Sequence, residues 1–223
     1  MVYFLPFMAV IGSFVFIYLT KPKSQKNVKL LLAFSGAFLL ALTFFELLPE
    51  VYNESNPKQV AVFILAGILL QVFLEFFSKG AEHGHVHFNL KQSTFPIVLL
   101  LSLSIHALIE GIPITNDTNI LYGILVHKVP VALILSIFLI NSKLSIKLVL
   151  LFMVIFGLMT PLGSFLATHS TIISEYSQQL SALAIGIFLH ISTIVLFESA
   201  QGHAFNLRKL AVIIFGIAIA YFL

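Results

Sequence analysis

Residues 95–114 read FPIVLLLSLSIHALIEGIPI, and only His106 and Glu110 in this run can ionise. A helix needs about 20 apolar residues to cross a hydrocarbon core of about 30 Å. The run has that length. Its continuous apolarity favours a membrane helix over a barrel strand, which would alternate in polarity and be about half as long. It therefore predicts a transmembrane helix with two ionisable groups near its middle.

The rest of the chain has the same character, because 59% of its 223 residues are hydrophobic and only 9% are charged. A soluble domain carries roughly a quarter charged residues. We therefore expect an all-α polytopic protein, a single transmembrane domain over residues 1–223, with lipid as its solvent and about eight spans. The predicted spans are roughly 2–20, 29–51, 58–78, 95–114, 119–140, 145–167, 178–202 and 206–223. The chain has no cysteine, which excludes thiolate metal sites, disulfides and thiol catalysis.

The positive charges predict the orientation of these spans, with both termini outside the cell membrane. Of the 12 Lys and Arg residues, only Lys58 falls in an outside loop and only Lys128 falls well inside a span. The others lie at inside connections: Lys21, Lys23, Lys26, Lys29, Lys79, Lys91, Lys143, Lys147, Arg208 and Lys209. Cytoplasmic loops carry such an excess in membrane proteins. The net charge of +3 is therefore an orientation signal and does not point to nucleic acid.

The loop of residues 79–92 carries His83, His85 and His87 on the predicted cytoplasmic side. Alternating histidines in a polar loop indicate either weak metal capture at the inner surface or a flexible solvated connection. A metal site inside the membrane would favour metal capture.

Ionisable residues at membrane depth are costly unless they are paired or functional. His106 and Glu110 are four residues apart, so they share one face of a helix. His127 falls at a similar depth on the next predicted helix, an antiparallel neighbour. Two imidazoles and a carboxylate at one depth suit a divalent metal, particularly Zn²⁺. The alternative is a structural hydrogen bond between His and Glu that holds the two helices together.

Other polar residues mark a candidate pathway. Lys128 could extend to the interface, pair with a carboxylate such as Glu46 or Glu198, or be neutral through burial. Glu46 lies toward the outside and Glu198 toward the inside, an arrangement that suits cation passage as well as interfacial charge. The remaining candidates are Thr160, His190 and His203.

Several motifs resemble those of the ZIP family of zinc and iron transporters. His106-Ala-Leu-Ile-Glu110-Gly is similar to the family's helix-four signature, and His127-Lys128-Val-Pro130 to its helix-five motif. Phe45-Glu46-Leu-Leu-Pro-Glu50 resembles the helix-two motif, and Thr160-Pro-Leu-Gly163 the helix-six motif. The resemblance implies uptake of Zn²⁺, or of Fe²⁺, Mn²⁺ or Cd²⁺, into the cytoplasm. It also implies a 3+2+3 arrangement, in which helices one to three and six to eight are inverted repeats; a homodimer is left open.

Four positions depart from the family members that bind two adjacent metals. Ala107, Lys128 and Thr160 replace ligands of the second site, and Val131 replaces a bridging Glu. The resemblance therefore implies one metal, held by His106, Glu110 and His127 with water or Glu46. It implies a transporter and not an enzyme. Two rival interpretations are an intramembrane zinc hydrolase, in which a bound metal activates water, and a metal sensor that does not transport.

Overall fold

The computed structural model describes residues 4–21, 26–53, 56–78, 95–114, 118–198 and 207–223. Throughout these residues the secondary structure is helical, which confirms the predicted all-α class. The elements are α1 (Leu5–Thr20), α2 (Lys26–Leu42), the π-helix η2 (Thr43–Leu47), α3 (Leu48–Asn53), α4 (Pro57–Ser78), α5 (Ile97–Glu110), α6 (Thr118–Ile140), α7 (Ile146–His169), α8 (Thr171–Glu175), α9 (Ser177–Glu198) and α10 (Leu207–Tyr221).

Five of the described helical segments are long and apolar enough to cross a membrane. They are Leu30–Asn53, Pro57–Ser78, Asn119–Ile140, Ile146–His169 and Ser177–Phe197, and Leu5–Thr20 and Ile97–Glu110 are shorter apolar helices. Large apolar side chains remain exposed on the outer surface, including Leu69 (69%) and Phe76 (76%) of α4. Exposed apolar area on this scale indicates contact with lipid. The chain is a multi-pass membrane protein, and the number of eight spans stays a prediction.

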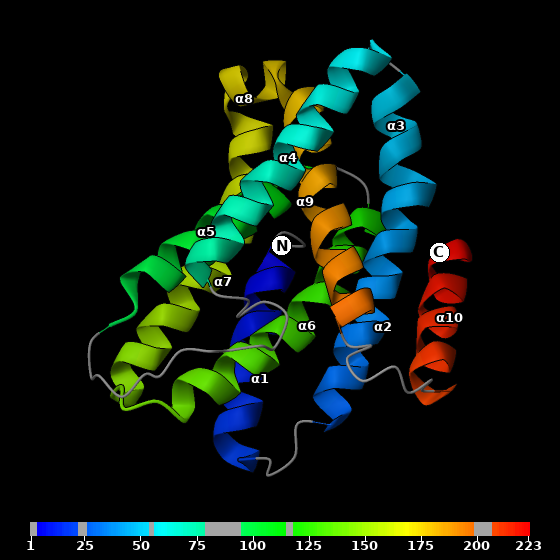
Figure 1. The fold of residues 1–223 in the computed structure, drawn as a ribbon. Helices are drawn as coiled ribbons and strands as arrows, with labels where there is room; N and C mark the ends of the chain where they lie inside the picture. Colours follow the sequence, from blue (N-terminus) through cyan, green and yellow to red (C-terminus); the bar gives the residue numbers. More distant parts are fainter. Residues whose placement is uncertain (1–3, 22–25, 54–55, 79–94, 115–117, 199–206) are drawn as a thin grey trace.

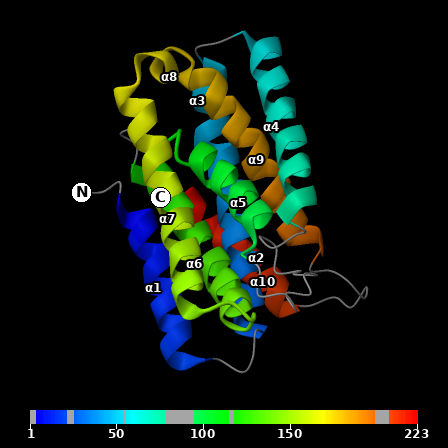
Figure 2. The same cartoon turned by 90° about the vertical axis from the view of Figure 1, so that its left-hand side faces the viewer.

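The helices pack as a bundle in which α4 lies against α9, α10 against α2, α1 against α6, and α5 against α7. In Figure 2, α1 and α7 form one edge, α4 forms the other, and α5, α6 and α2 lie between them. Figure 1 shows α8, the end of α3 and the start of α4 at one end of the bundle. The end of α1, the start of α2 and the turn between α6 and α7 lie at the opposite end. One side of α5 and one side of α6, the helices that carry the candidate site, face the buried core.

A pair of glycines lets α5 and α7 approach closely. At the crossing of α5 and α7, a Cβ on Gly111 would lie 2.1 Å from the Thr160 carbonyl oxygen, and one on Gly163 would lie 1.9 Å from that of Leu108. Close backbone contact through small residues is the usual way in which membrane helices associate without a hydrophobic driving force between them. The crossing fixes the end of α5, where the candidate site begins.

The structure ends α5 at Glu110, whereas the predicted span continued to residue 114. The amide of Gly111 donates to the Leu108 carbonyl at 3.2 Å, and the amide of Ile112 donates to the Ile109 carbonyl at 3.1 Å, so the chain tightens into a turn. Pro113 has no amide hydrogen to continue the helix. Pro130 and Pro161, in contrast, lie inside α6 and α7.

Candidate functional site

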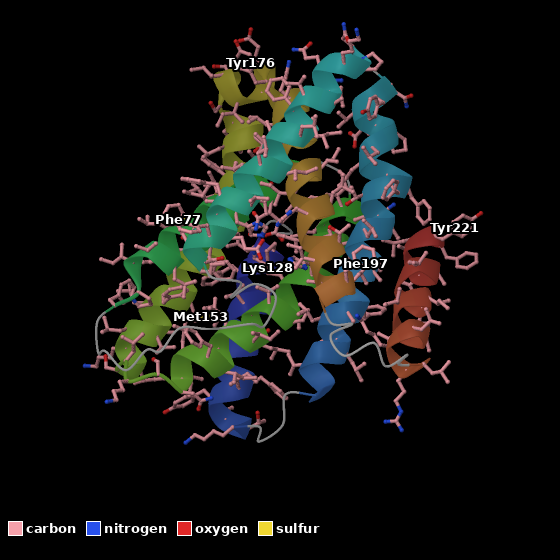
Figure 3. The ribbon with its side chains drawn as sticks, in the orientation of Figure 1. Phe77, Lys128, Met153, Tyr176, Phe197 and Tyr221 are labelled. Atoms are coloured by element: carbon pink, nitrogen blue, oxygen red, sulfur yellow. The ribbon has the colours of Figure 1, made fainter. Side chains whose placement is uncertain are left out.

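The centre of the bundle holds a group of buried polar side chains (Figure 3). Glu110, the last residue of α5, is fully buried. Its Oε2 accepts a hydrogen bond from the Lys128 ammonium and lies 3.8 Å from Nε2 of His106. Its Oε1 has no hydrogen-bond partner among the described residues. The arrangement therefore contains one buried carboxylate, one ammonium and one imidazole. One of the two carboxylate oxygens accepts no hydrogen bond from a described group.

His106 is oriented by a side chain from α4. Its Nδ1 lies 3.2 Å from Oε1 of Gln71, which is itself fully buried. Since an amide oxygen is an acceptor, the Nδ1–H donates, and the lone pair of Nε2 is left on the side of Glu110. Metal-binding histidines are commonly held in this way by an acceptor at the other ring nitrogen. Gln71 was not among the predicted site residues, although a glutamine within an apolar helix is a detectable signal.

Lys128 of α6 is 1% exposed and makes two contacts: the ion pair with Glu110, and a cation–π contact with Phe156 of α7, 4.8 Å from Nζ to the ring centroid. Neither carboxylate suggested by the sequence is its partner in the described residues. Glu46 lies half-buried on η2, and the side chain of Glu198 is outside the described residues. The sequence interpretation missed Glu110 because it assigned this carboxylate wholly to the metal.

His127 is also buried, at 2% exposure, on the same turn of α6 as Lys128. Adjacent residues of an α-helix point about 100° apart, so only one of the two can face Glu110 directly. In this structure Lys128 does so. Among the described residues, no group of three or more His, Asp or Glu side chains is arranged to hold a metal ion. The structure thus brings His106 and Lys128 to Glu110.

A second polar contact joins α4 to α9. Nε2 of His190 lies 2.7 Å from Oε2 of Glu75, and the two side chains are 14% and 25% exposed. Glu75 follows Gln71 by one turn of α4, and between them the Leu74 carbonyl accepts a hydrogen bond of 2.6 Å from Ser102 of α5. Polar groups therefore follow the inner side of α4 from the candidate site to His190. Glu75 was missing from the sequence prediction, which concentrated on histidine motifs.

The other predicted positions differ in how far the structure describes them. Thr160 is fully buried, its Oγ1 has no described hydrogen-bond partner, and its carbonyl faces Gly111. Ala107 and Val131, the two apolar replacements, are packed in the hydrophobic core. The residues His83, His85, His87 and His203 lie outside the described part of the chain.

Comparisons with known proteins identify the family of the chain. A model of the family described as ZIP zinc transporter matches residues 78–223. The chain is 32% identical over 127 residues to "Zinc transporter ZIP1" of Danio rerio, covering 51% of this chain and 41% of that protein. It is 29% identical over 150 residues to "Protein zntD" of Dictyostelium discoideum, covering 57% of this chain and 22% of that protein. The chain thus spans less than half the length of either relative, while the family model covers most of the chain itself. The chain belongs to the ZIP zinc transporter family.

Proposed function

We propose that this chain carries divalent metal ions, Zn²⁺ above all, across the cell membrane into the cytoplasm through a single site of His106, Glu110 and His127. The observation that carries the proposal is the environment of Glu110. This carboxylate is fully buried, its Oε1 is unsatisfied among the described residues, and its Oε2 lies 3.8 Å from His106. A buried carboxylate oxygen without a partner costs about 1–3 kcal/mol or more, unless a cation or donor reaches it.

The spacing of these atoms suits a small cation. Zinc binds imidazole nitrogen and carboxylate oxygen at about 2.0–2.2 Å. An ion between Nε2 of His106 and Oε2 of Glu110 would therefore fit the gap of 3.8 Å with little movement of the two side chains, which both belong to α5. His127, on the neighbouring helix, and a water molecule would complete four-coordination. Three protein ligands suit an ion that must leave again.

The pathway in this proposal follows the polar residues on either side of the site. Ions enter past Glu46, pass the central site beside Thr160, and leave past His190, Glu198 and His203 toward the histidines of the loop 79–92. Support comes from the row of Gln71, Glu75 and His190 contacts along the inner side of α4. The proposed topology has eight spans in a 3+2+3 inverted repeat with both termini outside. The printed name of the Danio rerio relative supports zinc as the substrate.

The test is zinc uptake by purified protein in liposomes that contain a fluorescent zinc indicator. The variant His106→Ala should reduce uptake at least tenfold, because it removes one of the proposed nitrogen ligands. His169→Ala is the matched control, since His169 is an exposed histidine at the end of α7. Equal uptake by the two variants would contradict the proposed site. Competition by Fe²⁺, Mn²⁺ and Cd²⁺ in the same vesicles would rank the substrates.

Glu110 requires a conservative substitution. Removing one member of a buried ion pair leaves the other charged and unpaired, which costs about 3–5 kcal/mol. Glu110→Ala would therefore confound loss of the site with loss of the fold, because Lys128 would remain buried. The double variant Glu110→Gln with Lys128→Met removes both charges and nearly preserves volume. It should fold and fail to transport zinc.

A further inference from the structure

The contact between Lys128 and Glu110 has a consequence for how an ion binds, because the ammonium already holds the carboxylate that the ion needs. Both side chains are almost wholly buried, at 1% and 0% exposure. The Lys128 ammonium contacts Oε2, the same oxygen that faces Nε2 of His106. Lys128 thus lies inside the proposed metal site as a cation fixed to the protein.

We propose that Lys128 is an internal competitor of the transported ion for Glu110, and that this competition keeps the site weak. The inference rests on the proposed function. Glu110 and Lys128 together carry no net charge, so a divalent ion that enters meets an ammonium within the same buried group. Repulsion between like charges is strong in a low-dielectric interior. Removing the ammonium should therefore tighten zinc binding.

The ammonium also has a second partner beside Glu110. The Phe156 ring lies 4.8 Å from Nζ, within the distance at which an aromatic face attracts a cation. The flexible four-carbon stem of lysine allows Nζ to move between the carboxylate and the ring. When an ion binds the Glu110 carboxylate, the ammonium still contacts the Phe156 ring. When the ion leaves, the ammonium contacts the carboxylate again. Each return of Lys128 to Glu110 therefore favours release of the ion.

An alternative geometry leads to the same expectation. The ion could bind Oε1 of Glu110, which has no described hydrogen-bond partner, while Lys128 stays on Oε2. The two cations would then lie on opposite oxygens of one carboxylate and still repel each other. In both geometries the charge of Lys128 weakens zinc binding. If Lys128 instead organised the site for the metal, removing it would weaken binding.

The experiment measures zinc affinity of the full purified chain in lipid nanodiscs by competition with a chelating indicator. Lys128→Met nearly keeps the volume of the side chain and removes its charge, so the dissociation constant should fall at least tenfold. Lys128→Arg keeps the charge and should bind zinc within threefold of the unmodified protein. The control is Lys209→Met, since Lys209 is a partly buried lysine that donates to the Leu196 carbonyl at 2.6 Å, away from the site. Unchanged or weaker binding by Lys128→Met would overturn the proposal.

A thermal measurement keeps the proposal testable if Lys128→Met folds poorly. Ligand binding stabilises the folded state, and the gain in stability grows with the logarithm of the ligand concentration divided by the dissociation constant. Saturating zinc should therefore raise the melting temperature of Lys128→Met by more than it raises that of the unmodified protein. An equal or smaller rise would overturn the inference. Failure of the proposed function appears differently, as zinc binding that survives His106→Ala in a protein that retains Lys128.

Discussion

The crossing of α5 and α7 allows a quantitative prediction for Gly163→Ala. A Cβ at position 163 would lie 1.9 Å from the Leu108 carbonyl oxygen and 3.3 Å from the Gly111 Cα. Real Cβ atoms essentially never approach another heavy atom closer than 3.0 Å, so the two backbones must separate by at least about 1.1 Å. Backbone lies on both sides of the contact, and no flexible side-chain end can move away instead.

The cost follows from two opposing effects. Inserting a methyl group into a tightly packed contact costs about 1–3 kcal/mol, and a contact with backbone belongs at the upper end of that range. Alanine favours a helix over glycine by about 1 kcal/mol. The net loss of stability should be about 2 kcal/mol, or about 4–8 °C in melting temperature for a chain of this size. Because Glu110 adjoins the crossing, a shift of about 1 Å should also reduce zinc uptake by up to 10²-fold.

The assay compares the melting temperatures of Gly163→Ala and Gly12→Ala in detergent, followed by uptake in liposomes. Gly12 lies on α1, and within the described parts of the chain no group beyond its own stretch of helix lies within 4 Å of a Cβ built there. Gly12→Ala should therefore keep or slightly raise the melting temperature, through helix propensity alone. If the two variants melt at the same temperature and transport equally well, the close approach of α5 and α7 is not what holds the site.

Two predictions concern the polar side chains of α4. Gln71→Leu keeps the bulk of the side chain but removes the acceptor for Nδ1 of His106, so zinc affinity should fall about 10–100-fold. Isothermal titration would measure the affinity, and an unchanged value would contradict the orienting role of Gln71. Glu75→Gln replaces the carboxylate that lies 2.7 Å from His190 and should lower the free energy of unfolding by about 1 kcal/mol, as measured by a melting curve. A melting curve equal to that of the unmodified protein would mean that this contact does not hold α4 to α9.

The fold class could be predicted from the sequence because continuous apolarity and helix length depend on composition alone. The position of His106 next to Glu110 was also predictable, since a spacing of four residues places two side chains on one helix face. The partner of Lys128 was not. That contact depends on how α6 is rotated about its axis relative to α5, and rotation is decided by packing that a single sequence does not display.

The end of α5 shows the same division between local and tertiary causes. Gly111 and Pro113 are local signals for a helix end, but proline also lies within α6 and α7, where the helix continues. The end of α5 differs from the two prolines within helices because Gly111 closely contacts the Thr160 carbonyl. Thr160 is far from Gly111 in the chain. Sequence reasoning therefore identified the chemistry of the site better than its geometry.

The π-helix η2 has a consequence for the evolution of length in this protein. Bonding from residue i to i+5 holds one more residue per turn than the α-helix, so Thr43–Leu47 contains a local insertion between α2 and α3. A deletion of one residue elsewhere in α2 would rotate everything beyond it by about 100° and shift it by about 1.5 Å. The same deletion within η2 would restore regular α-helix and leave both flanking helices in phase. Phe44, which is 55% exposed, is the residue of η2 whose loss would remove the least packing, whereas Phe45 packs edge-on against Tyr221 of α10.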